Sequence, residues 1–327
     1  MVLRSDQVVE VLRAAAEPTR LRILALLARE ELAVLELCRI LGQSQPRVSR
    51  HLKLLADAGL AERFRDGAWV FYRLAEPSPT RTLADQILAL VTPGDVTLAR
   101  DAQRLDGVSA ERAGQAAAYF AKNADRWDEI RSLYTAEAAV EAAILEAAGE
   151  GPFERLVDLG TGAGRMLTLL GGRARAAVGL DLSRQMLNIA RGAVAQAGLT
   201  NCELRHGDIL GAGVAGGEAD LVVVHQVLHY LGEPASAVAE AARLVAPGGR
   251  LLIVDFAPHD LEFLRAEHAH RRLGFFDLEM ERWLAASGLG GVFVTTLPPT
   301  VEGGLTVKIW GADRAAAKDA GRIRRIA

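Results

Sequence analysis

A glycine-rich turn is the feature of this sequence whose residue types point most directly to chemistry. Residues 158–165 read DLGTGAGR and lie between two apolar runs, FERLV and MLTLL, as a strand–turn–helix crossing would. Glycines at alternate positions, Gly160, Gly162 and Gly164, let the backbone turn tightly and approach a ligand where a Cβ would obstruct it. The turn therefore predicts a nucleotide-type ligand.

An acidic residue follows the turn at a distance typical of ribose recognition. Asp181 ends the next apolar run, AAVGLDLS, 21 residues after Gly160, where its carboxylate can accept hydrogen bonds from both ribose hydroxyls. A dinucleotide fingerprint requires a small residue at its sixth position, which is Arg165 here, and Asp158 stands two residues before the first glycine. This combination favours S-adenosylmethionine over NAD.

The elements that must position these residues alternate between strand-like and helical patterns. Such alternation predicts a parallel sheet that helices cover on both faces. The strand candidates read RLVDL, AAVGLDL, CELRHGDI, ADLVVVHQ, GRLLIVDF, GVFVTTLP and LTVKIWGA. Only the short PPTVEGG stretch joins the last two, so we expect them to form a terminal antiparallel hairpin.

Residues 119–313 resemble a class I S-adenosylmethionine-dependent methyltransferase of the ubiquinone/menaquinone C-methyltransferase-like type. Five motifs occur in that family's order: DLGTGAGR, GLDLSRQML, HGDIL, ADLVVVHQVLHYL and LVAPGGRLLIVDF. The resemblance implies an α/β Rossmann-like domain with a seven-stranded sheet whose last strand is antiparallel. It implies S-adenosylmethionine or S-adenosylhomocysteine as the cofactor, bound by Asp158, Gly160, Thr161, Gly162, Gly164, Asp181, Leu182, Met186, Asp208, Ile209 and His225.

Several of these positions have a structural interpretation as well. Gly162 can simply serve the turn, Met186 can belong to the core, and His225 can be a hydrogen-bonded histidine at a strand end. Methyl transfer from a sulfonium needs a general base only if the acceptor must lose a proton. His225 and His229 are the catalytic candidates, and His268 or His270 in EHAHRRLGF can also face the substrate; we predict no metal site.

A second signal lies near the N-terminus, where three short helical patterns follow one another. PTRLRILALLAR opens with a proline suited to a first helical turn, LAVLELCRIL ends at Gly42, and SQPRVSRHLKLLADAGL runs from Ser44, a capping residue type, to Gly59. The third helix is sharply two-sided. Its cations, Arg47, Arg50 and Lys53, repeat every three residues, and its apolar residues, Val48, Leu52 and Leu55, lie opposite.

This third helix has the footprint of a DNA recognition helix, whose early residues reach base edges while neighbouring cations hold phosphates. The following AERFRDGAWVFYRL fits a β-hairpin wing that turns at Asp66-Gly67, with Arg63, Arg65 and Arg73 adding positive charge. Residues 1–75 thus resemble the ArsR/SmtB winged helix-turn-helix repressors. The resemblance implies a double-stranded DNA operator contacted by Ser44, Gln45, Arg47, Ser49, Arg50, His51, Lys53, Arg65 and Arg73.

The sequence does not support the metal-sensing site that many members of this family carry. Many metal-sensing members carry paired cysteines in the second of these helices, whereas this chain offers only Cys38 there. A single thiolate binds a soft metal poorly without partners, and the other cysteine, Cys202, lies far along the sequence. Cys38 fits a small buried apolar residue better than a metal ligand.

We expect a multidomain protein with four segments: a DNA-binding domain at 1–75, a helical connector or dimerisation segment at 76–118, the methyltransferase domain at 119–313 and a basic tail at 314–327. The first 75 residues carry 12 Lys+Arg against 9 Asp+Glu, and the remainder 26 against 32. The segment that follows the connector, YFAKNADRWDEIRSLY, resembles the N-terminal cap of small-molecule methyltransferases, in which Tyr119, Trp127 and Tyr134 either close over the pocket or pack in the core. Leu83, Ile87 and Leu90 are candidates to extend a homodimer interface.

Two functions of different class follow. The first is a transcriptional regulator in which binding of the cofactor or its demethylated product is coupled to repression. The second is an active small-molecule methyltransferase, acting on carbon, oxygen, nitrogen or sulfur, with an autoregulatory or tethering DNA-binding domain. DNA methylation is disfavoured because HQVLHYL stands where the Asp/Asn-Pro-Pro-aromatic element is needed. Without a spanning apolar run or a signal-peptide pattern, we expect a cytoplasmic protein with no membrane partner.

Overall fold

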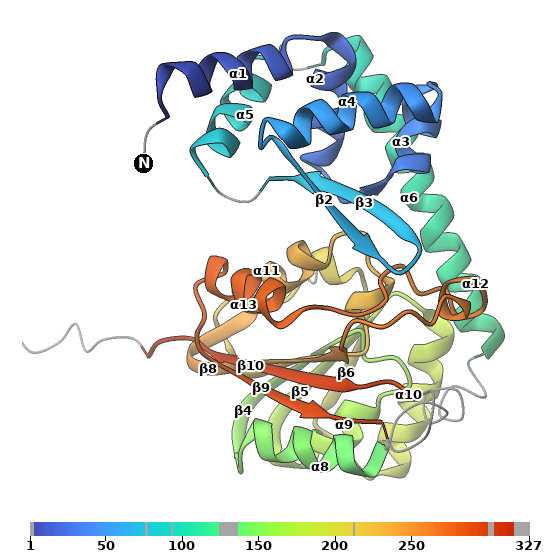
Figure 1. Ribbon diagram of the computed structural model, residues 1–327. Helices are drawn as coiled ribbons and strands as arrows, with labels where there is room; N and C mark the ends of the chain where they lie inside the picture. The colour runs from blue at the N-terminus through green and yellow to red at the C-terminus, as the bar shows by residue number, and fades with distance from the viewer. Residues whose placement is uncertain are drawn as a thin grey trace, which may run out of the picture. The chain divides into compact units, whose positions relative to one another are not determined.

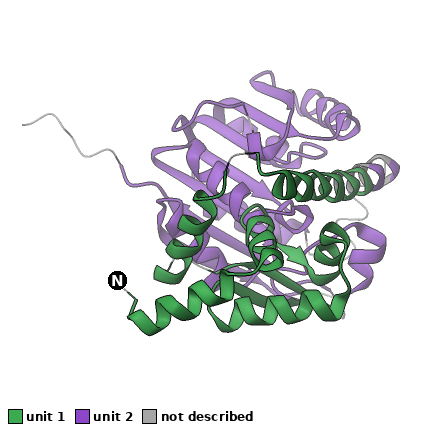
Figure 2. Ribbon diagram, turned by 90° about the horizontal axis from the view of Figure 1, so that it is seen from above, with its two compact units in different colours: residues 1–115 green, residues 116–327 purple. Residues whose placement is uncertain are grey.

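The computed structural model describes residues 3–75, 78–92, 94–123, 137–211, 213–299 and 304–316. Figure 1 shows their helices and strands, and Figure 2 shows the two compact units into which the chain divides, residues 1–115 and 116–327. Two residues of the predicted cap, Trp127 and Tyr134, lie outside the described residues, as does the basic tail from residue 317 onward.

The first unit is a helical domain with a small antiparallel sheet. Its elements are α1 (Ser5–Ala15), α2 (Pro18–Leu27), β1 (Leu32–Ala33), α3 (Val34–Leu41), α4 (Gln45–Asp57), β2 (Ala61–Asp66), β3 (Trp69–Leu74), α5 (Pro79–Ala89) and residues 96–115 of α6 (Val96–Asn123). The sheet order is β1-β3-β2. One apolar cluster, to which all the helices of the unit contribute, forms its core.

The local signals in the sequence explain where these helices end. Gly42 follows α3 with φ +66° and Gly59 follows α4 with φ +68°, both in the left-handed region that side chains with a Cβ rarely adopt. Ser44 stands at the N-cap position of α4, but its side chain accepts no cap hydrogen bond, contrary to the usual role of that residue type. Instead, Pro46 fixes φ in the first turn.

The wing differs slightly from its prediction. Asp66 pairs with Trp69 as the last rung between β2 and β3, so the turn residues are Gly67 and Ala68, not Asp66 and Gly67. The positive φ of Gly67, +58°, is what a tight hairpin turn requires at this position.

The second unit is a three-layer α/β domain. Its elements are α8 (Glu137–Ala148), β4 (Phe153–Leu159), α9 (Arg165–Leu170), the 3-10 turn η2 (Gly171–Arg173), β5 (Ala174–Asp181), α10 (Arg184–Gln196), β6 (Cys202–His206), η3 (Ile209–Gly211), β7 (Ala219–His225), η4 (Leu228–Tyr230), α11 (Pro234–Leu244), β8 (Val245–Phe256), α12 (Phe263–His268), α13 (Asp277–Ala286), β9 (Gly290–Leu297) and β10 (Val307–Asp313). Residues 116–123 of α6 also belong to it.

The seven strands follow the order β6-β5-β4-β7-β8-β10-β9. Neighbours from β6 to β8 are parallel, and β10 is antiparallel to both β8 and β9. The expected seven-stranded sheet with an antiparallel last strand is therefore confirmed.

Two apolar cores lie on opposite faces of this sheet. Val222 and Val224 of β7 belong to one buried cluster, whereas Leu221 and Val223 belong to the other. Because alternate residues of a strand face opposite sides, both faces of β7 must be covered. Helices α11 and α13 contribute to the first cluster, and α8 and α9 to the second. The loops at the carboxyl ends of β4, β5, β7 and β8 consequently meet along one edge.

Candidate cofactor and DNA-binding sites

The glycine-rich turn after β4 has a backbone conformation that glycine favours. Gly160 and Gly164 have φ of +73° and +84°, and Gly162 has +53°. A Cβ at Gly160 would lie 2.4 Å from Cγ2 of Val227, and one at Gly164 would lie 3.0 Å from Cβ of Ala190. Both glycines are therefore required by close approach as well as by conformation.

Asp158 is a buried carboxylate beneath this turn. Its Oδ2 accepts a hydrogen bond of 2.6 Å from the Thr161 hydroxyl, while Oδ1 is buried with no hydrogen-bond partner among the described atoms. Burial raises the pKa of Asp158 to about 7, and the nearby charge of Asp181 acts in the same direction, against the Thr161 hydrogen bond. A buried oxygen without a partner is costly, so this atom fits a ligand that donates a hydrogen bond or carries positive charge.

Asp181 connects the turn to the end of β5. Its Oδ2 accepts a hydrogen bond of 2.8 Å from the backbone N–H of Gly162, and its Oδ1 accepts one of 2.7 Å from that of Ser183. Burial raises the pKa of Asp181, partly offset by these backbone donors. Each carboxylate oxygen retains a lone pair, so the side chain can also accept from a ligand's hydroxyls.

The other predicted cofactor residues lie on the neighbouring loops. Met186 is buried in the first turn of α10, and Leu182 is 56% exposed just before it. Asp208 is exposed, and its Oδ1 accepts from the backbone N–H of Leu210, while Ile209 is buried. Arg165, the residue that departs from the dinucleotide pattern, points to α8, where it forms a bidentate ion pair with Glu141 at 2.5 and 2.6 Å.

The segment after β7 closes over the glycine-rich turn. His225 ends the strand half-buried, and Gln226 has φ +53°, an unusual conformation for a residue other than glycine. The Gln226 backbone N–H donates to Val254 O at 2.7 Å, and Val227 packs at Gly160. Such strained backbone concentrates at binding and catalytic sites.

A buried histidine–aspartate pair lies two residues further on. His229 Nδ1 is 2.8 Å from Oδ1 of Asp255, and both side chains are at most 2% exposed. Asp255 lies near the end of β8, 26 residues away, and no spacing in the sequence pointed to it. His259 and His270 complete the cluster: burial lowers the pKa of His259 to about 4 and that of His270 further.

The predicted recognition helix α4 has the expected polarity. Val48, Leu52 and Leu55 are fully buried, whereas Arg47, Arg50 and Lys53 are exposed. Ser44 and Gln45 are also exposed at its start, Ser49 is half-buried, and His51 Nδ1 lies 3.5 Å from Glu17 Oε2. Exposed cations at spacing three are the side chains that phosphate contacts with DNA require.

The cations of the wing do not all face solvent. Arg65 is exposed on β2, but Arg73 forms ion pairs with Glu62 at 3.1 Å and Glu31 at 3.4 Å, with 17% of its side chain exposed. The geometry therefore supports Arg73 least among the predicted DNA contacts. Sequence alone misses this, because Glu31 is distant in the chain.

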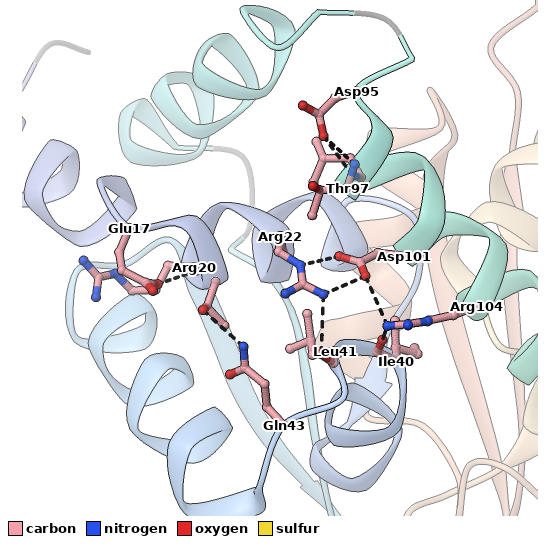
Figure 3. Close-up of polar contacts among 12 residues, drawn as sticks. Glu17, Arg20, Arg22, Ile40, Leu41, Gln43, Asp95, Thr97, Asp101 and Arg104 are labelled. Carbon is pink, nitrogen blue, oxygen red and sulfur yellow. Dashed lines mark hydrogen bonds and ion pairs between the residues drawn. The ribbon is translucent and has the colours of Figure 1, made fainter.

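Helix α6 is bound to the first unit by buried polar contacts. Arg22 of α2 forms a bidentate ion pair with Asp101 at 2.5 and 2.8 Å, and Asp101 is 2% exposed (Figure 3). Arg104 donates to Ile40 O at 2.9 Å (Figure 3). Leu105 and Val108 of the same helix are buried in the unit's apolar core. Residues 96–115 are thus part of the winged-helix core and not a loose connector.

No group of three or more His, Cys, Asp or Glu with the arrangement of a metal site occurs among the described residues. Cys38 is half-buried and burial raises its pKa, which disfavours the thiolate. Within the same described part of the chain, none of the helices has the length and apolarity to span a membrane.

Comparison with known proteins gives two matches on one chain. Residues 17–63 match the family model described as "Bacterial regulatory protein, arsR family", and residues 157–253 match that of a "Methyltransferase domain". An arsenic resistance transcriptional regulator, ArsR1, of Pseudomonas putida is 41% identical over 96 residues, 29% of this chain and 74% of that protein. The arsenical resistance operon repressor of Escherichia coli is 44% identical over 72 residues, 22% of this chain and 62% of that protein.

The second unit has relatives of its own. An uncharacterized methyltransferase of Bacillus subtilis, YcgJ, is 25% identical over 142 residues, 43% of this chain and 55% of that protein. The crystal structure of YcgJ covers 55% of this chain and all of its own, with a TM-score of 0.48 and 17% identity. The chain thus spans only about half to three quarters of the length of these curated relatives.

Proposed function

Because the chain belongs to the arsR family of bacterial regulatory proteins and carries a methyltransferase domain, we propose that it is a DNA-binding regulator whose operator affinity changes when its second unit binds S-adenosylmethionine or S-adenosylhomocysteine. Helix α6 is the observation that carries this proposal. Its residues 96–115 form part of the winged-helix core, and the same unbroken helix supplies residues 116–123 to the other unit. Helix α6 cannot detach from the DNA-binding core without losing buried contacts. A ligand that changes the position of the end of α6 therefore also acts on that core.

The DNA partner follows from the winged helix-turn-helix and from the exposed cationic face of α4. We propose a homodimer that places two α4 helices in successive major grooves, about 34 Å apart. The protein then acts where operator DNA lies, in the cytoplasm. Light scattering coupled to size-exclusion chromatography tests the dimer directly.

S-adenosylmethionine is the cofactor that a methyltransferase domain of this kind uses, and the described residues fit it. The glycine turn leaves room for close backbone approach, Asp181 can accept from ribose hydroxyls, and the unpartnered oxygen of Asp158 suits a cationic or hydrogen-bond-donating group. We propose that these residues, with Met186 and Ile209 on the flanking loops, bind the cofactor.

The test is a titration of the full-length protein with duplex DNA from its own promoter region, followed by fluorescence anisotropy. The titration is run without ligand, with S-adenosylmethionine and with S-adenosylhomocysteine. A coupled regulator shows at least a severalfold change in DNA affinity with one of the two ligands, and Asp181→Ala abolishes that change. Glu154→Gln is the matched control, because Glu154 is an exposed carboxylate on the adjacent strand β4.

The outcomes separate the parts of the proposal. If calorimetry shows that the wild-type protein binds ligand and that Asp181→Ala does not, yet the wild-type protein has the same DNA affinity under every ligand condition, the coupling is wrong and only the two binding activities remain. If neither ligand binds the wild-type chain, the cofactor site itself is wrong.

A second candidate function is methyl transfer to a small molecule. The buried His229–Asp255 pair favours it, because a pure sensor of the cofactor has no need of an oriented imidazole beside the glycine turn. In this case the winged helix regulates or tethers an active enzyme.

A further inference from the structure

The cluster around His229 contains three buried ring nitrogens without a hydrogen-bond partner among the described atoms. They are Nε2 of His229, Nε2 of His259 and Nδ1 of His270. Leaving a buried polar group without a hydrogen-bond partner is destabilising, so three such nitrogens in one cluster indicate a polar ligand whose groups complete them. The cluster is also aromatic: the His229 ring centroid lies 4.1 Å from that of His270 and 5.1 Å from that of Phe256.

The hydrogen bonds fix what two of these nitrogens can do. His229 Nδ1 faces a carboxylate oxygen at 2.8 Å, so the neutral ring carries its proton on Nδ1 and leaves Nε2 as an acceptor. His259 has the opposite arrangement, because its Nδ1 accepts from the backbone N–H of Leu261 at 3.3 Å. Neutral His259 therefore carries its proton on Nε2, which becomes a donor.

Asp255 is held firmly in its orientation. Its Oδ1 also accepts from the backbone N–H of Phe256 at 2.8 Å, and its Oδ2 lies 3.4 Å from the backbone nitrogen of His229. The backbone carbonyl of His229 in turn accepts from the N–H groups of Arg271 and Arg272, at 2.8 and 3.0 Å. The imidazole is thus fixed at both its ring and its backbone.

The cluster lies beside the predicted cofactor turn. Val227, two residues before His229, packs so closely on the turn that a Cβ at Gly160 would overlap it. In the sheet, β7 lies between β4, which leads into the turn, and β8, which carries Asp255. Parallel strands are about 4.8 Å apart, so the turn and Asp255 lie over strands separated by about 10 Å, a distance that a methyl group and its acceptor can occupy.

We propose that His229 is the general base of a methyl transfer to a phenol-type hydroxyl, that Asp255 is its positioning residue, and that His259 donates a hydrogen bond to the same hydroxyl oxygen. This inference rests on the second candidate function and names its acceptor class. An aromatic hydroxyl both donates and accepts, as the two opposed nitrogens require, and its ring matches the aromatic surroundings.

The proposed step balances without an external reagent. The acceptor's O–H proton passes to His229 Nε2 as the oxygen forms a bond to the methyl carbon. The carbon–sulfur bond breaks, and its electron pair remains on the sulfur of the product S-adenosylhomocysteine. The products are an aryl methyl ether and an imidazolium that the Asp255 carboxylate stabilises.

The test uses nuclear magnetic resonance of the full-length protein with ¹⁵N-labelled histidine, which has only seven imidazoles to resolve. The spectra are expected to show His229 protonated on Nδ1 and His259 protonated on Nε2. With S-adenosylhomocysteine present, phenol should shift both Nε2 resonances. Anisole, which has the same ring but no O–H, should leave them in place. His51 of the first unit, whose Nδ1 lies 3.5 Å from Glu17 Oε2 of the same unit, serves as an internal reference.

Variants separate orientation from chemistry. Asp255→Ala should reduce the Nδ1-protonated fraction of His229 several-fold, and Asp255→Asn should restore it, because an amide oxygen can keep the place of Oδ1 opposite the Phe256 N–H. His229→Asn keeps a donor toward Asp255 and removes Nε2, so it should lose both the phenol response and any transfer of labelled methyl to phenol.

The contrary outcomes are equally distinct. His229 protonated on Nε2 in the wild-type spectrum, or identical shifts with phenol and anisole, overturns the proposal while cofactor binding stands. Failure of S-adenosylhomocysteine to bind in calorimetry overturns instead the proposed function on which it rests.

Discussion

Replacing Gly160 by alanine tests whether the glycine turn and the segment after β7 form one packed site. Two penalties add at this position. The left-handed φ of +73° costs a residue with a Cβ about 1–2 kcal/mol, and the overlap with Val227 at 2.4 Å costs about 1–3 kcal/mol more. We therefore expect Gly160→Ala to destabilise the second unit by about 2–5 kcal/mol. Any relief of the overlap displaces Val227 or the turn, so S-adenosylhomocysteine affinity should fall about tenfold or more, equivalent to 1.4 kcal/mol.

A matched glycine isolates the overlap from the backbone penalty. Gly198 follows α10 with φ +69°, and a Cβ there would have nothing within 4 Å. Gly198→Ala should thus show only the conformational penalty of about 1–2 kcal/mol and bind ligand normally. Adding Val227→Ala to Gly160→Ala removes both overlapping methyl groups and should recover much of the ligand affinity.

The measurements are denaturant-dependent hydrogen exchange of peptides from β4 and β7, which reports on the second unit alone, and calorimetric titration with S-adenosylhomocysteine. If Gly160→Ala is no more destabilising than Gly198→Ala and binds ligand with wild-type affinity, the close packing of these two segments plays no part in the site.

The other predictions concern DNA binding, the attachment of α6 and pH. Arg50→Ala should weaken duplex binding and reduce the salt slope by about one, whereas Arg73→Ala should have little effect on the slope because its guanidinium is already paired; anisotropy at several salt concentrations decides between them. Asp101→Asn should destabilise the first unit by about 1–3 kcal/mol in hydrogen exchange, while Asp106→Asn, whose carboxylate is 62% exposed, should change stability by less than about 1 kcal/mol; equal effects would contradict the burial argument. Burial raises the pKa of Asp158 from 3.8 to about 7, so its contribution to stability is fully present below pH 3.8 and has been lost once pH has risen through 7. The stability difference between wild type and Asp158→Asn should therefore change between about pH 4 and 7 and level off above pH 7, and a constant difference across this window would refute the shift.

The sequence predicted most accurately those features that depend on neighbours in the chain. Gly42 and Gly59 end their helices as expected, because a left-handed residue is a local requirement of a helix terminus. The burial of Val48, Leu52 and Leu55 follows from helical periodicity alone. The alternation of strands and helices likewise predicted the parallel sheet, since covered strands are apolar throughout.

The features that sequence missed depend on tertiary contacts. Asp255 could not be connected with His229 by any spacing rule, because adjacent strands bring together residues 26 positions apart. The sequence predicts that the wing cation Arg73 contacts DNA, whereas the fold places Glu31 beside it at 3.4 Å. Of the residues suggested for a dimer interface, Leu83 and Ile87 pack against the unit's own core, whereas Leu90 is 85% exposed.

The polar attachment of α6 restricts how a ligand signal can reach DNA. A tenfold change in operator affinity requires about 1.4 kcal/mol of differential ligand binding. Releasing α6 from the winged helix would uncover the Arg22–Asp101 pair and the buried side chains of Leu105 and Val108, and full exposure of two such apolar side chains alone costs about 3–6 kcal/mol. A displacement that keeps these contacts is therefore far less costly than detachment. A tenfold change in operator affinity must accordingly move α6 and the DNA-binding core together. We therefore expect Asp101→Asn, which weakens the ion pair with Arg22, to diminish the ligand response before it abolishes DNA binding.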